Sequence, residues 1–186
     1  GTVVEPFRVV VVDEAGNELP MGEVGLLAFE APEGYGVAYH RDEEKTAKAY
    51  VRPGAFTLGD MGYVDPDGFV FITDRMSDMV VSGGVNLYPS ESEAVLRDHP
   101  GVADVAVIGI PHADPGEQLL ALVVPTDPAD PPAGADLEAF CRERLAAYKI
   151  PRRYEYLDEL PRNEMQKVDK KSLRRPYWDG DRTIGG

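Results

Sequence analysis

In the first seventy residues, short hydrophobic runs are separated by short polar stretches, which predicts strands joined by turns. One apolar run precedes the turn-forming stretch Asp13 to Asn17, and two others flank the sequence Asp65-Pro66-Asp67-Gly68. Such turn residues between apolar runs are typical of β-hairpins. The predicted strands are residues 7–12, 25–29, 59–64 and 69–72. Only the charged stretch 41–50 has helical character here.

The pattern then changes to alternating strands and helices. A helix is predicted from Pro89 to about Arg97, because Ser90 and Glu93 have the spacing of a capping box. A second helix follows from an apolar stripe at Leu137, Phe140, Cys141 and Leu145. The remaining predictions are strands at 76–82, 102–110, 118–124 and 154–157, and a short helix at 170–177.

These patterns predict an α+β fold in two parts. Residues 1–76 are expected to be mostly β, and residues 77–186 to form a small α+β domain with a central sheet and flanking helices. No apolar run approaches the ~20 residues that cross a bilayer, so no membrane span is expected. The single cysteine, Cys141, excludes an internal disulfide and fits the reducing cytoplasm, which is the expected location.

Charge changes this picture in one respect. The formal net charge is −14, which disfavours nucleic acid as a partner. Residues 142–175, however, hold 11 Lys or Arg against 6 Asp or Glu, a net +5 that leaves −19 for the rest. A basic segment on an acidic body could hold a small polyanion, but a solvated surface explains the same charges more simply.

Several ordered motifs cover nearly the whole chain. They are Leu58-Gly59-Asp60, Asp67 to Arg75, Ser82-Gly83-Gly84, Tyr148-Lys149-Ile150-Pro151 and Leu160 to Lys167. Together they resemble the adenylate-forming superfamily, which includes acyl-CoA synthetases, luciferase and peptide-synthetase adenylation domains. The C-terminal ending at 177–182 is similar to that of fatty or steroid acyl–CoA ligases, so a fatty-acid–CoA ligase is the most similar type.

This resemblance implies a large N-terminal domain that binds ATP and a carboxylic acid, and a mobile C-terminal lid. Residues 1–76 would be the β-rich end of that large domain, whose remainder is missing, and residues 77–186 the lid. The implied partners are a small-molecule carboxylic acid, ATP and CoA, with Mg²⁺ bound by ligands outside this chain. The chain by itself is then expected to be inactive, and the sequence leaves a homo-oligomer open.

Three residues carry the implied chemistry. Asp60 would accept hydrogen bonds from the ribose hydroxyls of ATP, although a turn aspartate is the plainer alternative. Arg75 would contact nucleotide oxygens, unless it forms a surface ion pair with Asp74 or Asp78. Lys167 would be the catalytic residue, stabilising charge on the α-phosphate as pyrophosphate leaves.

The resemblance assigns further roles to the segment between these residues. Gly83 and Gly84 would line the path of the pantetheine arm of CoA, and a plain turn is the alternative. The domain hinge would fall at Ser77, with Asp78 as a second candidate. Gln166 stands where the family usually has glycine, and Lys170 and Lys171 lie close enough to compete with Lys167.

The predicted function is therefore an ATP-dependent acid–CoA ligase that works through an acyl-adenylate. One alternative is an adenylation domain that loads a carrier protein. Another is a non-catalytic module that binds a nucleotide or CoA. His99 and His112 lack neighbouring ligands at zinc spacing, so no metal site is expected within the chain.

Overall fold

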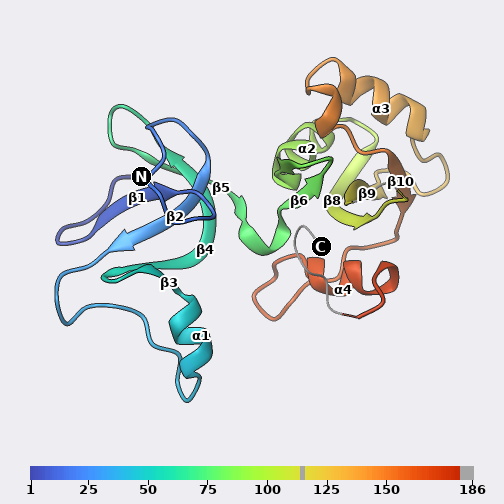
Figure 1. The fold of residues 1–186 in the computed structure, drawn as a ribbon. Helices are drawn as coiled ribbons and strands as arrows, with labels where there is room; N and C mark the ends of the chain where they lie inside the picture. The colour runs from blue at the N-terminus through green and yellow to red at the C-terminus, as the bar shows by residue number, and fades with distance from the viewer. Residues whose placement is uncertain (114–115, 181–186) are drawn as a thin grey trace. The chain divides into compact units, whose positions relative to one another are not determined.

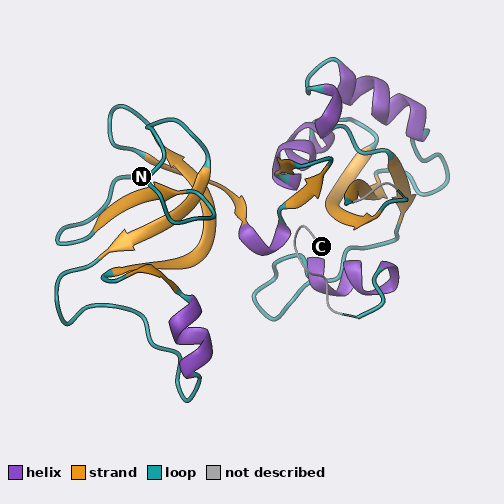
Figure 2. Ribbon diagram, in the orientation of Figure 1, coloured by secondary structure: helices purple, strands orange, loops and turns teal. Residues whose placement is uncertain are grey.

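The computed structural model describes residues 1–113 and 116–180, which form two compact units. The units are residues 1–77 and 78–186, so the division lies one residue beyond the expected boundary. The first unit consists mainly of strands, and the second alternates strands and helices (Figures 1 and 2). The predicted α+β class is confirmed. Residues 181–182 of the ending similar to acyl–CoA ligases lie outside the described residues.

The first unit is built on one antiparallel sheet in the order β1-β2-β4-β3, with β5 also paired to β4. Its core gathers Val10 and Val12 with Ala28, because alternate residues of a strand face the same side. Its elements are β1 (Arg8–Val12), β2 (Gly25–Glu30), α1 (Glu43–Lys48), β3 (Tyr50–Arg52), β4 (Ala55–Val64) and β5 (Val70–Arg75).

The predicted helix at 41–50 is shorter in the structure. Asp42 is the N-cap of α1, and its side chain accepts a hydrogen bond from the Lys45 N–H. Arg41 before it has a φ of 56°, which is incompatible with a right-handed helix. At the other end, Tyr50 already belongs to β3. The short strand β3 was not predicted, because three residues are too few for a periodic pattern.

The second unit is built on the three-stranded sheet β10-β9-β8. Strands β8 and β9 are antiparallel, and β10 runs parallel to β9. Helices α2 and α3 cover one face, where Leu96 and Leu137 pack, and α4 covers the other, where Leu173 packs. Because both faces are covered, β8 and β9 are apolar at nearly every position, as the sequence showed.

The predicted elements of this unit are present with shifted ends, but β7 and η2 were not predicted. η1 (Met76–Asp78) lies across the division between the units. The elements after it are β6 (Val80–Ser82), β7 (Val85–Leu87), α2 (Pro89–Arg97), β8 (Val102–Pro111), β9 (Glu117–Pro125), α3 (Gly134–Arg142), η2 (Ala147–Lys149), β10 (Arg153–Tyr156), α4 (Lys170–Arg174) and η3 (Arg175–Tyr177). The expected strand at 76–82 was wrong in its first half, where Met76–Asp78 form a 3₁₀ turn. The polar pair Ser77-Asp78 interrupts the apolar pattern there.

The capping-box prediction for α2 was wrong. The N-cap is Tyr88, which makes no side-chain capping bond, and Ser90 already lies inside the helix. Glu93 instead accepts a hydrogen bond from the backbone N–H of Val107 in β8 at 2.8 Å. Because Glu93 is buried, its carboxylate serves tertiary packing rather than the helix end.

Candidate functional site

Asp60 lies in the middle of β4, where that strand bulges. Thr57 and Met61, four residues apart in β4, pair with Ala28 and Leu26, only two apart in β2. Gly59 has a φ of 79° within this bulge, a conformation that favours glycine. The turn-aspartate alternative was therefore wrong. A glycine inside a strand pattern was the sequence signal for the bulge.

Arg75 pairs with Asp60 across the sheet. The two residues are directly opposite each other in β4 and β5, and Arg75 Nε lies 2.8 Å from Asp60 Oδ1. Of the expected alternative partners, Asp78 pairs with Arg174 instead, and Asp74 Oδ1 accepts the backbone N–H of Arg75. The guanidinium is 56% exposed, so it keeps donors free for a ligand while it orients the carboxylate.

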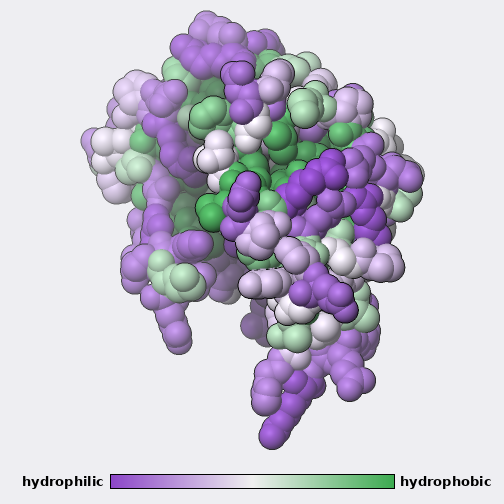
Figure 3. Space-filling view, turned by 90° about the vertical axis from the view of Figure 1, so that its left-hand side faces the viewer, coloured by the Kyte–Doolittle hydropathy of each residue, from purple (hydrophilic) through white to green (hydrophobic). Residues whose placement is uncertain are grey.

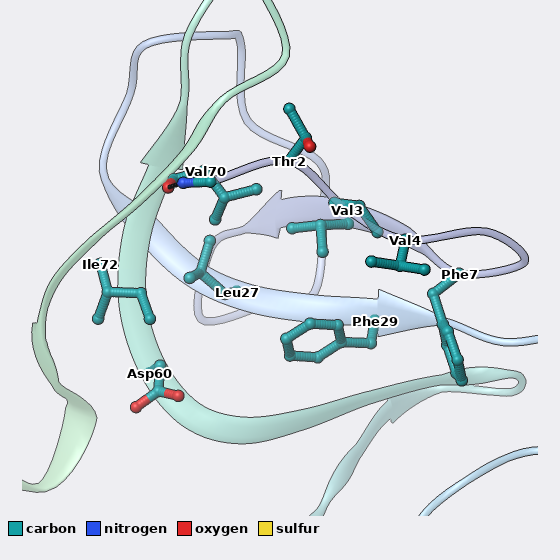
Figure 4. A pocket seen from close by; sticks show the side chains of 11 residues that line it. Thr2, Val3, Val4, Phe7, Leu27, Phe29, Asp60, Val70 and Ile72 are labelled. Carbon is teal, nitrogen blue, oxygen red and sulfur yellow. Dashed lines mark hydrogen bonds between the residues drawn. The ribbon is translucent and has the colours of Figure 1, made fainter.

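An apolar pocket of about 370 Å³ opens beside Asp60. Figure 4 shows Leu27 and Phe29 of β2 at its centre, with Asp60 at one end and Phe7 at the other. Asp60 is the one acidic residue of its lining. Hydrophobic side chains also gather in a hollow on the face that Figure 3 displays. An apolar wall with one carboxylate suits a ligand that has a flat or aliphatic body and hydroxyl groups.

Gly83 and Gly84 form the turn between β6 and β7. Both have left-handed φ values, 57° and 78°, and the flanking Ser82 and Val85 are paired. This is the two-residue hairpin turn that requires positive φ at both positions. A Cβ at either glycine would meet nothing within 4 Å, so the turn alone explains both residues without a bound ligand. Their predicted role at the pantetheine arm stays a prediction.

Lys167 lies in an exposed loop that is closed by its own hydrogen bonds. The side chain of Asn163 accepts the N–H of Met165 and of Lys167, and the Asn163 N–H donates to the Lys167 carbonyl. Arg162 donates to the carbonyl of Gln166. Gln166 has a φ of 61°, a left-handed conformation that is unfavourable for residues with a Cβ, so glycine would suit this position.

Most basic groups of the stretch 142–175 are already paired. Within the described residues, seven of its 11 Lys and Arg form ion pairs with carboxylates, so little of its +5 charge forms a free anion site. Lys170 is one of them, with its Nζ 2.7 Å from Glu93 Oε1 and 13% exposed. Among the described residues of this stretch, Lys167 is exposed and has no carboxylate partner, whereas Lys170 is held by Glu93.

The end of this loop is the start of α4. Asp169 is the N-cap, and its carboxylate accepts hydrogen bonds from the N–H and O–H of Ser172. These bonds favour the ionised form, which lowers the pKa of Asp169 below its ordinary value. The loop that carries Lys167 therefore ends at the capped N-terminus of α4.

Three carboxylates that hold this region were not predicted. Glu93, Asp104 and Asp78 bind Lys170, Arg162 and Arg174, respectively. Each pair joins residues far apart in the chain, so no local pattern could have revealed it. Within residues 1–113 and 116–180, no three His, Cys, Asp or Glu side chains gather as a metal site, and no helix is long and apolar enough to span a membrane.

Comparisons with known proteins agree on one family. Residues 91–167 match the family described as "AMP-binding enzyme C-terminal domain". The chain is 43% identical over 92% of its length to a fatty acid–[acyl-carrier-protein] ligase, ScoC, from Streptomyces coeruleorubidus, and 35% identical over 96% to a medium/long-chain-fatty-acid–CoA ligase, FadD8, from Mycobacterium tuberculosis. It covers 32% of each relative, so it spans about a third of their length.

A solved structure extends the likeness to three dimensions. The ATP-bound crystal structure of MatB from Rhodopseudomonas palustris matches 96% of the chain with a TM-score of 0.86 and 38% sequence identity. The chain covers 35% of that protein. Both units therefore follow a fold that a relative uses in an ATP complex.

Proposed function

The chain belongs to the adenylate-forming superfamily and carries its C-terminal domain, and on this premise we propose that it is part of an ATP-dependent acid–thiol ligase. The first unit would be the β-rich end of a large adenylating domain, and the second unit its mobile lid. The relatives extend over about three times the length of this chain, so the remaining site would lie in the large domain.

The proposed reaction has two steps. A carboxylate oxygen attacks the α-phosphorus of ATP, and the bond from that phosphorus to the bridging oxygen breaks to release pyrophosphate. The sulfur of a thiol, having lost its proton, then attacks the acyl carbonyl carbon, and AMP leaves. The products are a thioester, AMP and pyrophosphate, with no change in oxidation state.

Lys167 is proposed to act in the first step. Negative charge moves between the α-phosphate and the leaving pyrophosphate in the transition state, and an ammonium placed there would stabilise it. The observation that carries this assignment is that the exposed ammonium of Lys167 has no carboxylate partner among the described residues, whereas Lys170 is ion-paired. A cation already held by a buried carboxylate would have to break that pair before it could bind phosphate.

Asp60 and Arg75 are proposed to bind the nucleotide. The Asp60 carboxylate keeps acceptor capacity beyond its bond to Arg75, enough for the ribose hydroxyls. The neighbouring apolar pocket offers surface for the body of a ligand. ATP would bring Mg²⁺, and its protein ligands would come from the large domain.

The acceptor thiol and the acid are proposed at the level of class. A fatty or other carboxylic acid and CoA are the first choice. ScoC is named as a ligase to an acyl-carrier protein, which keeps carrier loading as the alternative. A non-catalytic binding module is less well supported, because Asp60, Arg75 and Lys167 are all present.

The test is acid- and ATP-dependent pyrophosphate release with a panel of fatty acids. The 186-residue chain is expected to release none, and the full-length enzyme to release it readily. In the full-length enzyme, Lys167→Ala should slow adenylation far more than thioester formation from preformed adenylate. Lys171→Ala is the matched control, because it removes the same charge from an exposed position four residues away, and it should change neither step.

Two results would contradict the proposal. Equal loss of both steps in Lys167→Ala would remove the role of this lysine in adenylation. Clear release of pyrophosphate by the 186-residue chain would show that a complete site lies within it. The proposal that activity needs a further large domain would then be wrong.

A further inference from the structure

The loop that carries Lys167 is exposed, and the residues on either side of it, Leu160 and Val168, pack in the core of the second unit. Its hydrogen bonds run among Arg162, Asn163, Gln166 and Lys167, and residues 161–167 are all exposed. Internal bonds of this kind fix the shape of a loop but not its direction. The direction of the Lys167 side chain must therefore depend on how the two ends of the loop are held.

The C-terminal end is held by a buried ion pair. Lys170, three residues after Lys167, places Nζ 2.7 Å from Glu93 Oε1, and the two side chains are 13% and 7% exposed. The same oxygen of Glu93 accepts the Val107 N–H at 2.8 Å, and the other lies 3.3 Å from Arg97. Glu93 thus joins α2, the centre of β8 and α4 at one point.

The ion pair at the N-terminal end is weaker. Arg162 pairs with Asp104 of β8, but these side chains are 41% and 30% exposed. Exposed ion pairs contribute little because water screens them, whereas removal of one partner from a buried pair leaves an uncompensated charge. Of the two ion pairs that flank the loop, the one formed by Glu93 is therefore the stronger.

Distance makes this anchor relevant to Lys167. Three residues span at most about 10 Å, so a displacement of Lys170 also displaces Lys167. A misplacement of about 1 Å at a reacting group can cost on the order of a hundredfold in rate. A residue that holds Lys170 can consequently change the chemistry without touching the substrate.

We propose that Glu93, through its buried pair with Lys170, is a positioning residue that aims Lys167 at the phosphates in the adenylation step. This inference rests on the proposed function of Lys167. It assigns to Glu93 a role in the first half-reaction only, because Lys167 is proposed to act in that step alone. A purely structural role would instead impair both half-reactions together.

The experiment measures both half-reactions in the full-length enzyme. Glu93→Gln keeps an oxygen for the Val107 N–H but removes the charge, and Lys170→Met removes the partner. Each should slow adenylation about tenfold or more and leave thioester formation from preformed adenylate within about threefold. Lys170→Arg should retain most of the adenylation rate. Glu138→Gln, which breaks an exposed pair with Arg142 on α3, is the matched control and should change neither step.

The decisive comparison uses the Lys167→Ala background. If Glu93 acts through Lys167, adding Glu93→Gln to Lys167→Ala should cause no further loss of adenylation. Fully additive losses, or equal loss of both half-reactions in Glu93→Gln alone, would overturn the proposal.

Amide hydrogen exchange on the 186-residue chain tests the same anchor without catalysis. The N–H groups of Lys167 and Asp169 donate to Asn163 and Pro161. Glu93→Gln should speed their exchange about tenfold, whereas Glu138→Gln should not. Unchanged exchange in Glu93→Gln would overturn the proposal, whatever the activity of the enzyme. A wild-type enzyme that forms no adenylate would instead count against the proposed function.

Discussion

The carboxylate of Asp78 lies 2.7 Å from the guanidinium of Arg174, which comes 96 residues later in the chain. Both side chains are largely buried, at 17% and 11% exposed. Asp78 is the first residue of the second unit, so this pair ties the beginning of that unit to α4 near its end. Of the two hinge candidates, Asp78 has a side chain that is anchored within the second unit, and Ser77 is the position tested below.

The Asp78–Arg174 pair should contribute measurably to the stability of the second unit. Asp78→Asn and Arg174→Met should each lower the free energy of unfolding by about 2 kcal/mol, because each leaves a buried charge without its partner. Urea unfolding of the 186-residue chain measures both. The double variant should cost less than the sum of the two, and strict additivity would show that the residues do not interact in solution.

The hinge assignment predicts a separation of the two half-reactions. Proline restricts φ to about −65°, so Ser77→Pro should permit only one orientation of the lid. In the full-length enzyme one half-reaction should fall about tenfold or more while the other survives. Ser77→Ala should leave both intact. Equal activity of Ser77→Pro and the wild type in both steps would place the hinge elsewhere.

Gln166 should be a site where glycine stabilises the protein. Its φ of 61° is unfavourable for a residue with a Cβ, at about 1 kcal/mol. Gln166→Gly should therefore raise the free energy of unfolding by up to that amount, and Gln166→Val should lower it, because a β-branched side chain tolerates this conformation least. Thermal unfolding of the three proteins checks the order. The opposite order would mean that the loop leaves this conformation in solution.

The proposed ribose contact of Asp60 is testable with a modified nucleotide. A hydrogen bond to a charged group is worth about 1.5–3 kcal/mol, so 2′-deoxy-ATP should be a roughly tenfold or more poorer substrate for the full-length enzyme. In Asp60→Ala the preference for ATP over 2′-deoxy-ATP should shrink towards one. An undiminished preference in that variant would assign the ribose to another residue.

Tyr177 should make stability fall at high pH. Burial, together with the hydrogen bond to Glu155, raises the pKa of Tyr177 to about 12. The unfolded value is about 10, so the neutral phenol stabilises the folded state fully below pH ~10 and loses this effect as pH rises to about 12. Chemical unfolding across this range measures the fall.

Substitution separates Tyr177 from the other tyrosines. Tyr177→Phe should flatten part of the fall between pH 10 and 12, and Tyr154, whose pKa is also raised by burial, should account for more. Tyr148→Phe is the control, because that side chain is 56% exposed. An identical pH profile in Tyr177→Phe would show that its phenol is not buried in solution.

The sequence alone determined the features that depend on neighbouring residues. Apolar runs predicted the longer strands of both units, and turn residues predicted the hairpin at 65–68, because these patterns follow from the geometry of the strand and the turn. Ordered motifs identified the superfamily, and with it Asp60, Arg75 and Lys167 as candidate site residues.

Only the tertiary structure decided which charges are free and which are used in packing. Glu93 has the sequence spacing of a capping residue, yet the fold turns it towards Val107 and Lys170. A turn was the alternative for Asp60, and the bulge in β4 and the pairing with Arg75 place it within the sheet instead. These contacts join residues 14 to 77 positions apart, and their energies depend on burial. Burial is a property of the packed molecule, and no local pattern of residues contains it.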